Sequence, residues 1–502
     1  MSSRERISHV DTAWLRMDRP SNLMQIVGVM LFEGDIDYER LRNSIERGML
    51  CYRRFRQVAV EDGAGYYWQD DPDFELDHHL HRELLPGKAG KVELQHFVAD
   101  LAAMPLNPGR PLWEMHLVDT SLGGSALVMR LHHSIADGIA MVGVLLSMMQ
   151  GSPDATEPAL PPIVEETDDE EEEDHESGGD PFLDSLWKPM SEAMATSLRI
   201  STNLWVGYID LLSNPTKLMD YARLGTSIAG ELAKLALMPD DSPTRFKGKP
   251  GVSKRVAWSE PIPLPEVKAV GKVLGCSVND LLLSSAAGAL RAYLVERGDE
   301  VDEVEIRAMV PVNMRRPKDA GKLGNRFGLV ALELPVGLEN PLARLYATRA
   351  RMEELKGSYQ AALTLSILGV VGMAPKVVQQ QVLDMLANKA TAVMTNVPGP
   401  TTPLYLAGAR LRQPLFWVPQ SGDIGMGLSI LSYDGKVQFG LITDRNLVPD
   451  PERIVERFAR EFDKLLTLVL MEPWDRLADP VAVEEGLVAT PPARRRSARR
   501  AS

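Results

Sequence analysis

The sequence predicts an α/β protein in two halves joined by a long connector. Segments with strand signals alternate with segments of helical periodicity on both sides of a central stretch that shows no such alternation. The length of 502 residues exceeds that of one ordinary domain. The composition, 44% apolar and 25% charged, is typical of globular proteins and supplies enough apolar side chains for sizeable cores.

The first half, residues 1–150, begins its alternation near residue 20. Its first strand is followed by the turn signal Glu33-Gly34-Asp35, and two later strands flank the turn signal SLGGS at residues 121–125. The expected elements are the strand Leu23–Phe32, the helix Tyr38–Leu50, the strands Trp113–Val118 and Leu127–Leu131, and the helix Ile139–Met149.

The rest of the chain is predicted as four parts. Residues 151–180 form an acidic disordered linker, 181–250 a Leu/Met-rich helical connector, 251–472 the second α/β half and 473–502 a flexible tail. In the second half we expect the helices Ser277–Glu296, Pro341–Lys356 and Pro451–Leu470, and the strands Glu305–Asn313, Leu329–Pro335, Ala390–Asn396, Leu411–Val418, Met426–Ser432 and Val437–Thr443.

Two charge runs dominate the formal net charge of −14. Residues 165–176 carry ten acidic side chains and no basic one, and Arg494 to Arg500 contains five arginines. Without both runs the body has a charge of −9 and no basic stripe, which excludes a nucleic-acid-binding protein. The acidic run indicates a solvated linker in preference to a binding site. The arginine tail is either a disordered end or a contact for anionic lipid or nucleic acid.

Cysteine content and hydropathy favour a cytoplasmic protein. Only Cys51 and Cys276 occur, so no disulfide framework is expected, and the start MSSRERISHVD lacks the apolar core of a secretory signal. The longest uncharged window, residues 357–375, is interrupted by polar side chains and ends in proline. It predicts either buried core or a segment that lies in a membrane interface, not a spanning helix.

The heptapeptide HHSIADG, residues 132–138, is the most informative stretch of the chain. It follows an apolar strand and precedes an apolar helix, and a random order of the same composition would contain HHxxxDG on the order of 0.001 times. The other pair, His78-His79, has Arg82 and Glu83 where the heptapeptide has Asp and Gly, and no Cys or carboxylate partner at a spacing that suits a metal. We therefore interpret it as exposed polar residues of a strand.

The chemistry of this stretch favours a general base. An imidazole accepts a proton near neutral pH, and one at the tip of a buried strand is held rigidly while it faces a cavity. Asp137 either orients that imidazole or holds the turn through a buried ion pair, and Gly138 lets the backbone enter the helix tightly. Because the chain has no G-x-S-x-G elbow, P-loop or dinucleotide fingerprint, we expect direct attack by a bound substrate without a covalent acyl-enzyme.

HHSIADG resembles the HHxxxDG signature of the CoA-dependent acyltransferase superfamily, which includes chloramphenicol acetyltransferase and peptide-synthetase condensation domains. Its surroundings resemble the bacterial wax ester synthase/diacylglycerol acyltransferase family over about residues 10–470. The supporting motifs are Pro111-Leu112-Trp113, Asn279-Asp280, residues 310–315 (VPVNMR), 324–328 (GNRFG) and 395–400 (TNVPGP).

The resemblance implies two chloramphenicol-acetyltransferase-like domains with mixed sheets and an active-site tunnel between them. His133 is then the general base and His132 a supporting neighbour. The remaining implied residues are structural: Asp137 with Gly138 in the turn, Arg56 as the arginine that pairs with Asp137, and Asn279 as a support of the site, unless it caps its helix. Among the three arginines of RRFRQ, residues 53–57, Arg56 matches the family best.

The implied reaction is acyl transfer from acyl-CoA, as co-substrate, to diacylglycerol, a long-chain alcohol, or both. Thr395 and Asn396 are candidate donors to the oxyanion or contacts of the tunnel, and the scheme requires no metal and no cofactor. Two alternatives are kept. One is another HHxxxDG acyltransferase that acts on a polyketide or glycolipid hydroxyl or takes its acyl group from a carrier protein. The other is a catalytically silent lipid-binding protein.

Two departures from the family pattern accompany these matches. Leu23-Met24-Gln25 replaces a PMH-like triplet, and Asp18 replaces a preceding acidic residue that is often Glu. Both are expected to act at the tunnel mouth, where they would alter substrate preference. Because the acceptors are almost insoluble, the protein is expected to work at the surface of the inner membrane or of lipid inclusions. The apolar stretches Trp187–Leu237 and Tyr359–Met373 are expected either to lie in that interface or to pack between the two domains.

Overall fold

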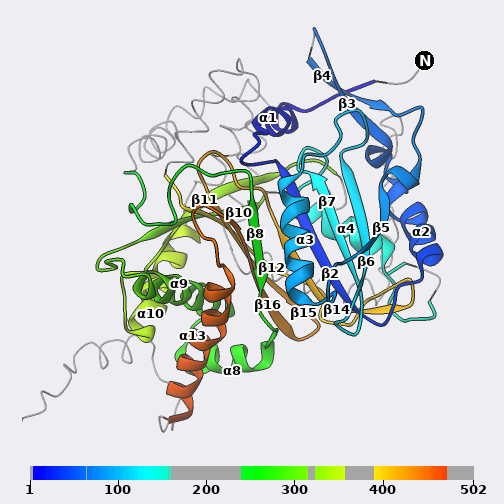
Figure 1. The fold of residues 1–502 in the computed structure, drawn as a ribbon. Helices are drawn as coiled ribbons and strands as arrows, with labels where there is room; N and C mark the ends of the chain where they lie inside the picture. Colours follow the sequence, from blue (N-terminus) through cyan, green and yellow to red (C-terminus); the bar gives the residue numbers. More distant parts are fainter. Residues whose placement is uncertain are drawn as a thin grey trace, which may run out of the picture.

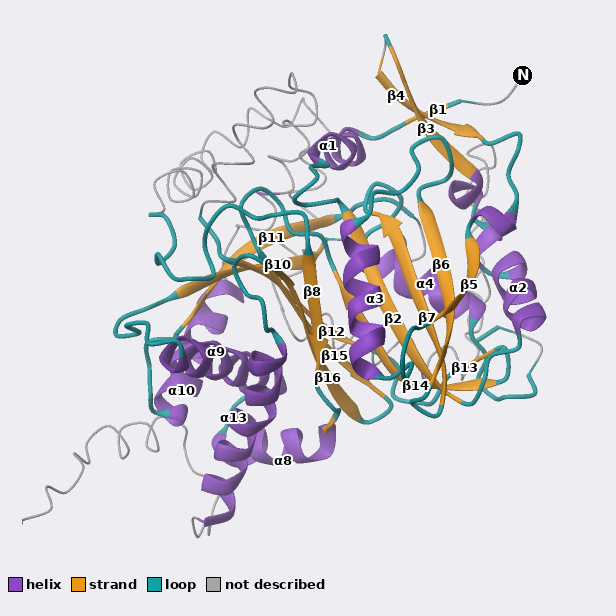
Figure 2. Ribbon diagram, viewed as in Figure 1, coloured by secondary structure: helices purple, strands orange, loops and turns teal. Residues whose placement is uncertain are grey.

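The computed structural model describes residues 4–63, 65–155, 158–159, 239–314, 323–356, 364 and 389–471. Two mixed β-sheets stand beside each other in this part of the chain, and helices cover their faces (Figure 1). Figure 2 shows that the helices α8, α9, α10 and α13 gather on one side of the second sheet, whereas α3 lies against the first sheet at the boundary between the two. The predicted α/β class with two mixed sheets is confirmed.

The first sheet has six strands, and the histidine motif lies at the end of one of its central strands. β7 is buried along its whole length and lies between β2 and β6. It runs antiparallel to both of these strands. The parallel pair β5–β6 closes one edge. In spatial order the strands are β13 (Tyr405–Leu406), β14 (Ala409–Trp417), β2 (Gln25–Glu33), β7 (Gly124–His132), β6 (Trp113–Thr120) and β5 (Leu80–Leu84).

The second sheet combines parallel and antiparallel pairs. β12 runs parallel to both β10 and β15, and the remaining pairs are antiparallel. In spatial order its strands are β11 (Phe327–Leu334), β10 (Ile306–Asn313), β12 (Ala392–Pro398), β15 (Met426–Tyr433), β16 (Lys436–Asp444) and β8 (Lys254–Trp258), with β9 (Ile262–Pro263) paired to β16. A separate three-stranded sheet contains β1 (Glu5–Arg6), β4 (Gly65–Asp70) and β3 (Gln57–Asp62).

One strand from the second half of the chain, β14, joins the first sheet and is called the exchanged strand below. β14, which was predicted as part of the second half, pairs with β2 in the first sheet from Arg410 opposite Glu33 to Trp417 opposite Val27. The segment 251–472 is therefore not confined to one sheet, and the expected boundary between the halves is crossed at residues 405–417. Strand periodicity identified β14 but carries no information about its partner.

An apolar layer joins the two sheets. It contains Val27 and Val128 from the first sheet, Trp258 and Ile442 from the second, and Trp417 from the exchanged strand, all buried. The helix α3 (Lys91–Ala103) adds its buried residues Leu94 and Val98 to the same layer and packs against β8. The layer fixes the two halves relative to each other. A site with residues from both halves requires such a fixed arrangement.

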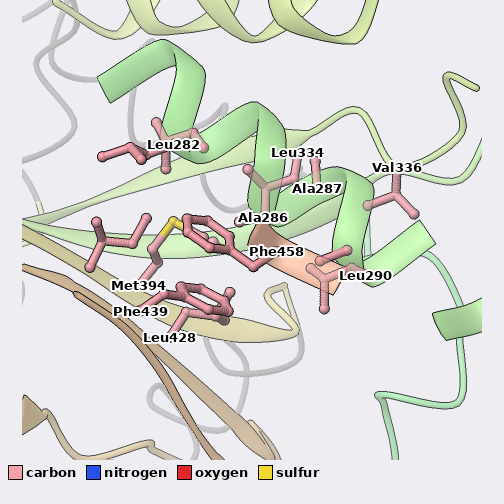
Figure 3. Packing of buried hydrophobic residues seen from close by; sticks show 14 of the residues in the cluster. Leu282, Ala286, Ala287, Leu290, Leu334, Val336, Met394, Leu428, Phe439 and Phe458 are labelled. Carbon is pink, nitrogen blue, oxygen red and sulfur yellow. The ribbon is translucent and has the colours of Figure 1, made fainter. Parts of the chain in front are cut away.

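The helices of the second half cover one face of its sheet (Figure 3). In α13 (Glu452–Met471) the buried residues Ile454, Phe458, Phe462 and Leu465 recur at helical spacing, and Phe458 stacks on Phe439 of β16 with ring centroids 4.0 Å apart. The remaining α-helices of the described residues are α8 (Leu264–Leu274), α9 (Val278–Glu296) and α10 (Pro341–Lys356) in this half, and α1 (His9–Met17), α2 (Tyr38–Arg47) and α4 (Gly138–Met148) in the first.

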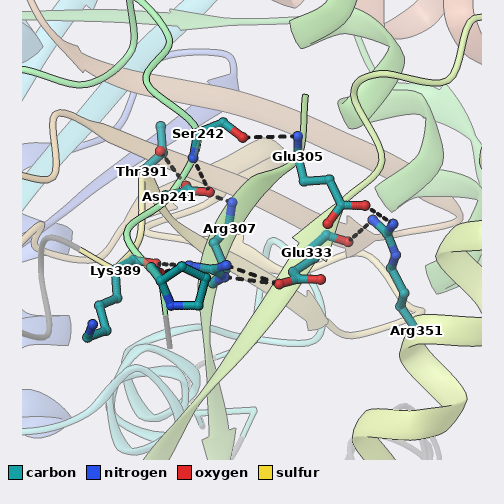
Figure 4. Close-up of polar contacts among 9 residues, drawn as sticks. Asp241, Ser242, Glu305, Arg307, Glu333, Arg351, Lys389 and Thr391 are labelled. Atoms are coloured by element: carbon teal, nitrogen blue, oxygen red, sulfur yellow. Dashed lines mark hydrogen bonds and ion pairs between the residues drawn. The ribbon is translucent and has the colours of Figure 1, made fainter. Parts of the chain in front are cut away.

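A buried polar network holds the start of the second half (Figure 4). The carboxylate of Asp241 accepts hydrogen bonds from the Arg307 backbone N–H (2.8 Å) and the Thr391 hydroxyl (2.5 Å). The Arg307 guanidinium donates to the carbonyls of Pro239 (2.9 Å) and Lys389 (3.0 Å) and to Glu333. Residues 239–250, which were predicted as the end of a helical connector, form no helix and are held in this way against β10.

The predicted linker also differs at its start. Ala159 is buried in the first core, its backbone N–H donates to the Met149 carbonyl (2.5 Å), and Gln150 pairs with Tyr405. The acidic run, the tail and Trp187–Leu237 lie outside the described residues, as does Tyr359–Met373 except Thr364. Among the described residues no single helix has the length and apolar character of a membrane span. Only the bent pair α8 and α9, at 99° to each other, passes that test together.

Candidate functional site

The histidine motif occupies the turn between a strand and a helix, as predicted. β7 ends at His132 and α4 begins at Gly138. Asp137 caps α4, because its side chain accepts a hydrogen bond from the Ala140 backbone N–H (3.0 Å). All residues from His132 to Asp137 are buried.

His133 is held between two aromatic side chains from opposite halves of the chain. Its imidazole stacks on Trp14 of α1 with ring centroids 4.4 Å apart, and it lies 5.4 Å from Phe327 at the start of β11. Its backbone N–H donates to the Met24 carbonyl and its own carbonyl accepts from Asn325 Nδ2, both at 2.7 Å. Ring and backbone are therefore positioned from both sides.

The surroundings of His133 favour its neutral form. Burial lowers the pKa of this imidazole to about 4, although Asp137 opposes the shift and His132 adds to it. Nδ1 is enclosed and makes no aligned hydrogen bond, but the residue's own carbonyl lies close enough to raise the pKa slightly. At neutral pH the ring is unprotonated and can accept a proton.

His132 is oriented by its neighbours in a different way. The Ser134 backbone N–H donates to His132 Nδ1 (3.1 Å), and the Ser134 hydroxyl lies 2.8 Å from the same nitrogen. Since Nδ1 accepts, the ring proton is placed on Nε2, which lies 3.4 Å from Asp18 Oδ2. That contact is not aligned as a hydrogen bond, but it is short enough for electrostatic attraction. His132 therefore stabilises the turn through Ser134, and its ring nitrogens are not directed at His133.

The two departures from the family pattern lie beside this histidine pair. Asp18 faces His132 and also accepts a hydrogen bond from the Met24 backbone N–H (2.6 Å). Gln25 is the register partner of His132 across β2 and β7, and its side chain donates to the Met104 carbonyl (2.9 Å). The structure thus places Asp18 against the His132 ring and Gln25 opposite His132 on the neighbouring strand, and the predicted effect on a tunnel mouth stays a prediction.

Asp137 connects the turn to the second half of the chain. One carboxylate oxygen caps α4 and the other accepts from the Arg326 backbone N–H (3.0 Å). The adjacent backbone adds a bridge, because the Asp137 N–H donates to the Gly324 carbonyl and the Gly324 N–H donates to the Ile135 carbonyl, both at 3.3 Å. Asp137 thus holds residues 324–326 against the turn.

The predicted pairing of Arg56 with Asp137 is wrong. Arg56 is exposed at the end of the short 3-10 helix Arg53–Arg56, where its charge acts on Asp70, while Asp137 is 3% exposed. The neighbouring arginines are also committed elsewhere, Arg53 to Asp70 and Arg54 to Glu5. Matching by sequence position failed here because three arginines within four residues offered no way to tell which side chain points inward.

Asn325 is a site residue that the sequence motif contained but to which no role was given. Its amide nitrogen donates to the His133 carbonyl and to Asp11 Oδ1, each at 2.7 Å, and it is buried. Asp11 of α1 also accepts from the Ser8 hydroxyl, and burial raises the pKa of its carboxyl against the effect of these hydrogen bonds. In the sequence, only the resemblance of residues 324–328 (GNRFG) to a family motif hinted at this contact, because residues 11, 133 and 325 meet solely through the tertiary fold.

Gly138 is not required by the backbone. Its φ lies outside the left-handed region, and a methyl group on its Cα would contact no atom of the described residues within 4 Å. The predicted reason, a tight entry into the helix, therefore does not hold. As far as the described residues show, the space beside the first residue of α4 is open instead.

The predicted residues Asn279 and Asn396 are brought into contact although 117 positions separate them. The amide of Asn396, on β12, donates to Asn279 Oδ1 on α9. The cap of α9 is Ser277, which forms a capping box with Asp280, so the alternative of Asn279 as a helix cap is excluded. The hydroxyl of Thr395 is buried and donates to the Leu428 carbonyl (3.4 Å).

The described side chains around His133 supply a base without a nucleophile of their own. Ser134, the hydroxyl nearest in sequence, is fully buried and bonded to His132. Such an arrangement suits proton removal from a bound substrate, with aromatic and backbone contacts that fix the base. The predicted tunnel stays a prediction.

Comparison with known proteins agrees with this arrangement. The model of the wax ester synthase/diacylglycerol acyltransferase catalytic domain matches residues 7–282, and the model of the WS/DGAT C-terminal domain matches residues 323–466. A putative diacylglycerol O-acyltransferase of Mycobacterium tuberculosis is 25% identical over 486 residues, which cover 92% of this chain and 90% of that protein. A probable diacylglycerol O-acyltransferase of the same species is 29% identical over 468 residues, which cover 89% and 95%.

Solved structures show the same fold. The wax ester synthase/diacylglycerol acyltransferase of Marinobacter aquaeolei superposes with a TM-score of 0.62 at 21% identity, covering 92% of this chain and 99% of that one. The first condensation domain of the calcium-dependent antibiotic synthetase has a TM-score of 0.57 at 14% identity, with 93% and 96% covered. Since the two family models together span most of its length, the chain belongs to the wax ester synthase/diacylglycerol acyltransferase family.

Proposed function

We propose that this protein is an acyl-CoA-dependent O-acyltransferase that esterifies diacylglycerol, long-chain alcohols, or both, with His133 as the general base. The single observation that carries the proposal is the geometry of His133, a buried and neutral imidazole fixed between Trp14, Phe327 and Asn325 in a chain of this family. The relatives cited above are named as a putative and a probable diacylglycerol O-acyltransferase, and the Marinobacter structure is named as a wax ester synthase/diacylglycerol acyltransferase.

In the proposed reaction Nε2 of His133 takes the proton of the acceptor hydroxyl, because Nδ1 is enclosed. The hydroxyl oxygen forms a bond to the thioester carbonyl carbon, and the carbonyl oxygen becomes an oxyanion. Collapse of this intermediate breaks the carbon–sulfur bond, and the proton on His133 passes to the departing CoA sulfur. The products are one ester and one free CoA thiol, and His133 is neutral again.

The open space beside Gly138 supports a substrate path past the base. Any side chain at residue 138 would project into that space at the N-terminus of α4. We assign to Gly138 the role of leaving room for substrate, in place of the backbone role that the structure excludes. Asn396 and Thr395 remain candidates for the oxyanion site, and Asn396 keeps a second amide hydrogen besides the one donated to Asn279.

The acceptors of this reaction are almost insoluble, so we propose that the protein works at a membrane or lipid-droplet surface without spanning it. Flotation with liposomes tests this part of the proposal. The protein should rise with the vesicles and be released by carbonate or mild detergent. Protein that stays at the bottom with every lipid composition contradicts surface attachment.

An acceptor panel with palmitoyl-CoA tests the activity itself. Release of the CoA thiol and the ester product are measured with diacylglycerol, hexadecanol, a glycolipid and no acceptor. The proposal predicts ester formation with diacylglycerol or hexadecanol. Ester formed with the glycolipid alone would support a different acyltransferase of the superfamily, and thiol release with no acceptor at the same rate would indicate hydrolysis.

A further inference from the structure

A cluster of titratable side chains lies on the first sheet, away from the histidine motif. His81 on β5 and His116 on β6 are register partners across this parallel pair, with ring centroids 4.9 Å apart. Glu114, two residues before His116, points to the same side of the sheet. One ligand atom from each of the three lies within 4.8 Å of the others.

His116 directs one ring nitrogen, Nε2, toward this cluster without an aligned hydrogen bond. The residue is 6% exposed, and its buried Nε2 makes no hydrogen bond among the described residues, although Glu114 lies close to it. A buried imidazole nitrogen that makes no hydrogen bond carries a free-energy cost, which a bound ion would remove. Phe97 of α3 packs edge-on against the ring and holds it in this orientation.

The other nitrogen of His116 is already oriented by a carboxylate. Nδ1 lies 3.4 Å from Glu83 Oε1, so a proton on Nδ1 faces Glu83 and leaves Nε2 as an electron-pair donor. In metal sites a carboxylate commonly orients a ligand histidine through its other nitrogen in this way. Nε2 also lies 3.5 Å from Glu114 Oε2, so the Glu114 carboxylate faces the same space as this nitrogen.

We propose that His81, His116 and Glu114 form a binding site for a divalent transition metal of the zinc class, with an open fourth position. Two imidazoles and one carboxylate are a donor set that suits zinc. His81 is only half-buried, so its side chain has room to move toward the ion and complete the three ligands. Arg130 is bonded to Oε2 of Glu114 at 2.5 Å, which leaves Oε1 for the ion. With neutral imidazoles, the carboxylates of Glu83 and Glu114 outweigh the charge of Arg130, so the empty cluster is negative.

The proposed metal site is separate from the acyl-transfer histidine. His116 pairs with Val128, which precedes His133 by five residues along β7. At about 3.3 Å per residue the two sites lie roughly 16 Å apart along the strand. The metal is therefore assigned to the edge of the first sheet beneath α3 and has no part in the proposed proton transfer.

Zinc binding to the untagged full-length protein tests the site. Equilibrium dialysis against Zn²⁺ followed by elemental analysis is compared for the parent, His81→Gln and the matched control His78→Gln. His78 is half-exposed, lies at the end of the short 3-10 helix Leu76–His78 just before β5, and faces Glu75 outside the cluster. Near-ultraviolet circular dichroism verifies that each variant is folded, and Co²⁺ provides an independent signal through its visible absorption.

The proposal predicts that His81→Gln holds one zinc ion per chain fewer than the parent, or binds that ion at least tenfold more weakly. The visible Co²⁺ bands should weaken in the same variant, while His78→Gln should match the parent in both measurements. Equal stoichiometry and affinity in the parent and His81→Gln would overturn the assignment, because any zinc bound would then reside at other side chains. Equal losses in His81→Gln and His78→Gln would also overturn it.

Discussion

Replacement of Asp137 separates its structural role from a catalytic one. In Asp137→Ala the cap of α4 is lost, which costs about 1 kcal/mol, and so is the charge-assisted bond from the Arg326 N–H, which costs roughly 1.5–3 kcal/mol. We expect the free energy of unfolding to fall by about 2.5–4 kcal/mol. Asp137→Asn keeps one acceptor oxygen but turns an amide N–H₂ toward a backbone donor, so about 2 kcal/mol should be lost.

The assay pairs urea unfolding with CoA-thiol release per folded molecule. Turnover of folded Asp137→Asn should fall less than tenfold, because Asp137 reaches His133 only through the turn and through its charge, which raises the pKa of that imidazole. A variant with the stability of the parent and abolished turnover would refute this reasoning. Asp137 would then be an orienter of the base, not a clamp between the two halves.

Three further predictions concern the base, its support and the linker. The pKa of His133 is lowered to about 4, below the ordinary 6.5, so the unfolded chain binds its proton first and stability falls as the pH drops from 6.5 toward 4. Between pH 7.5 and pH 5 the free energy of unfolding, measured with urea, should fall by about 2 kcal/mol more in the parent than in His133→Gln. Equal decreases in the two proteins would contradict the lowered pKa. Asn325→Ala removes the donor to Asp11 and to the His133 carbonyl. The free energy of unfolding should fall by about 3 kcal/mol and turnover at least tenfold, because two buried acceptors lose their donor. The exposed control Asn43→Ala should change neither quantity. Replacing residues 165–179 by Gly/Ser of equal length should leave turnover within twofold, and a large drop would reveal a functional partner of the acidic run.

Periodicity predicted most of the regular elements that surround the site. The helix Pro341–Lys356 agrees at both ends, and the strands around Trp113 and Leu127 and the helix after Gly138 agree within a few residues. These segments have one buried face or are buried throughout, so their apolar pattern is strong. The helices α1, α3 and α8 were not predicted. The hydrophobic pattern of α3 is weak, and its apolar residues are ordered by contact with β8 and not by one clear stripe.

The partners of the site residues depended on the tertiary fold. The position of His133 between a strand and a helix follows from the sequence, but its stacking on Trp14 and the hydrogen bond from Asn325 join residues more than 100 positions apart. Strand exchange by β14 likewise requires a register that the period-two pattern does not specify. Arg56 was assigned a role from its position in the family motif. The sequence could not show that its side chain is exposed, whereas Asp137 is buried.

The most direct test of the central claim is CoA-thiol release from palmitoyl-CoA with diacylglycerol or hexadecanol, whichever the parent esterifies, measured for the parent and for folded His133→Ala. A general base contributes about 10²- to 10⁴-fold, and no nucleophile of the protein replaces it in the proposed scheme. We expect a loss in that range while palmitoyl-CoA still binds. Turnover within threefold of the parent would contradict the assignment of His133.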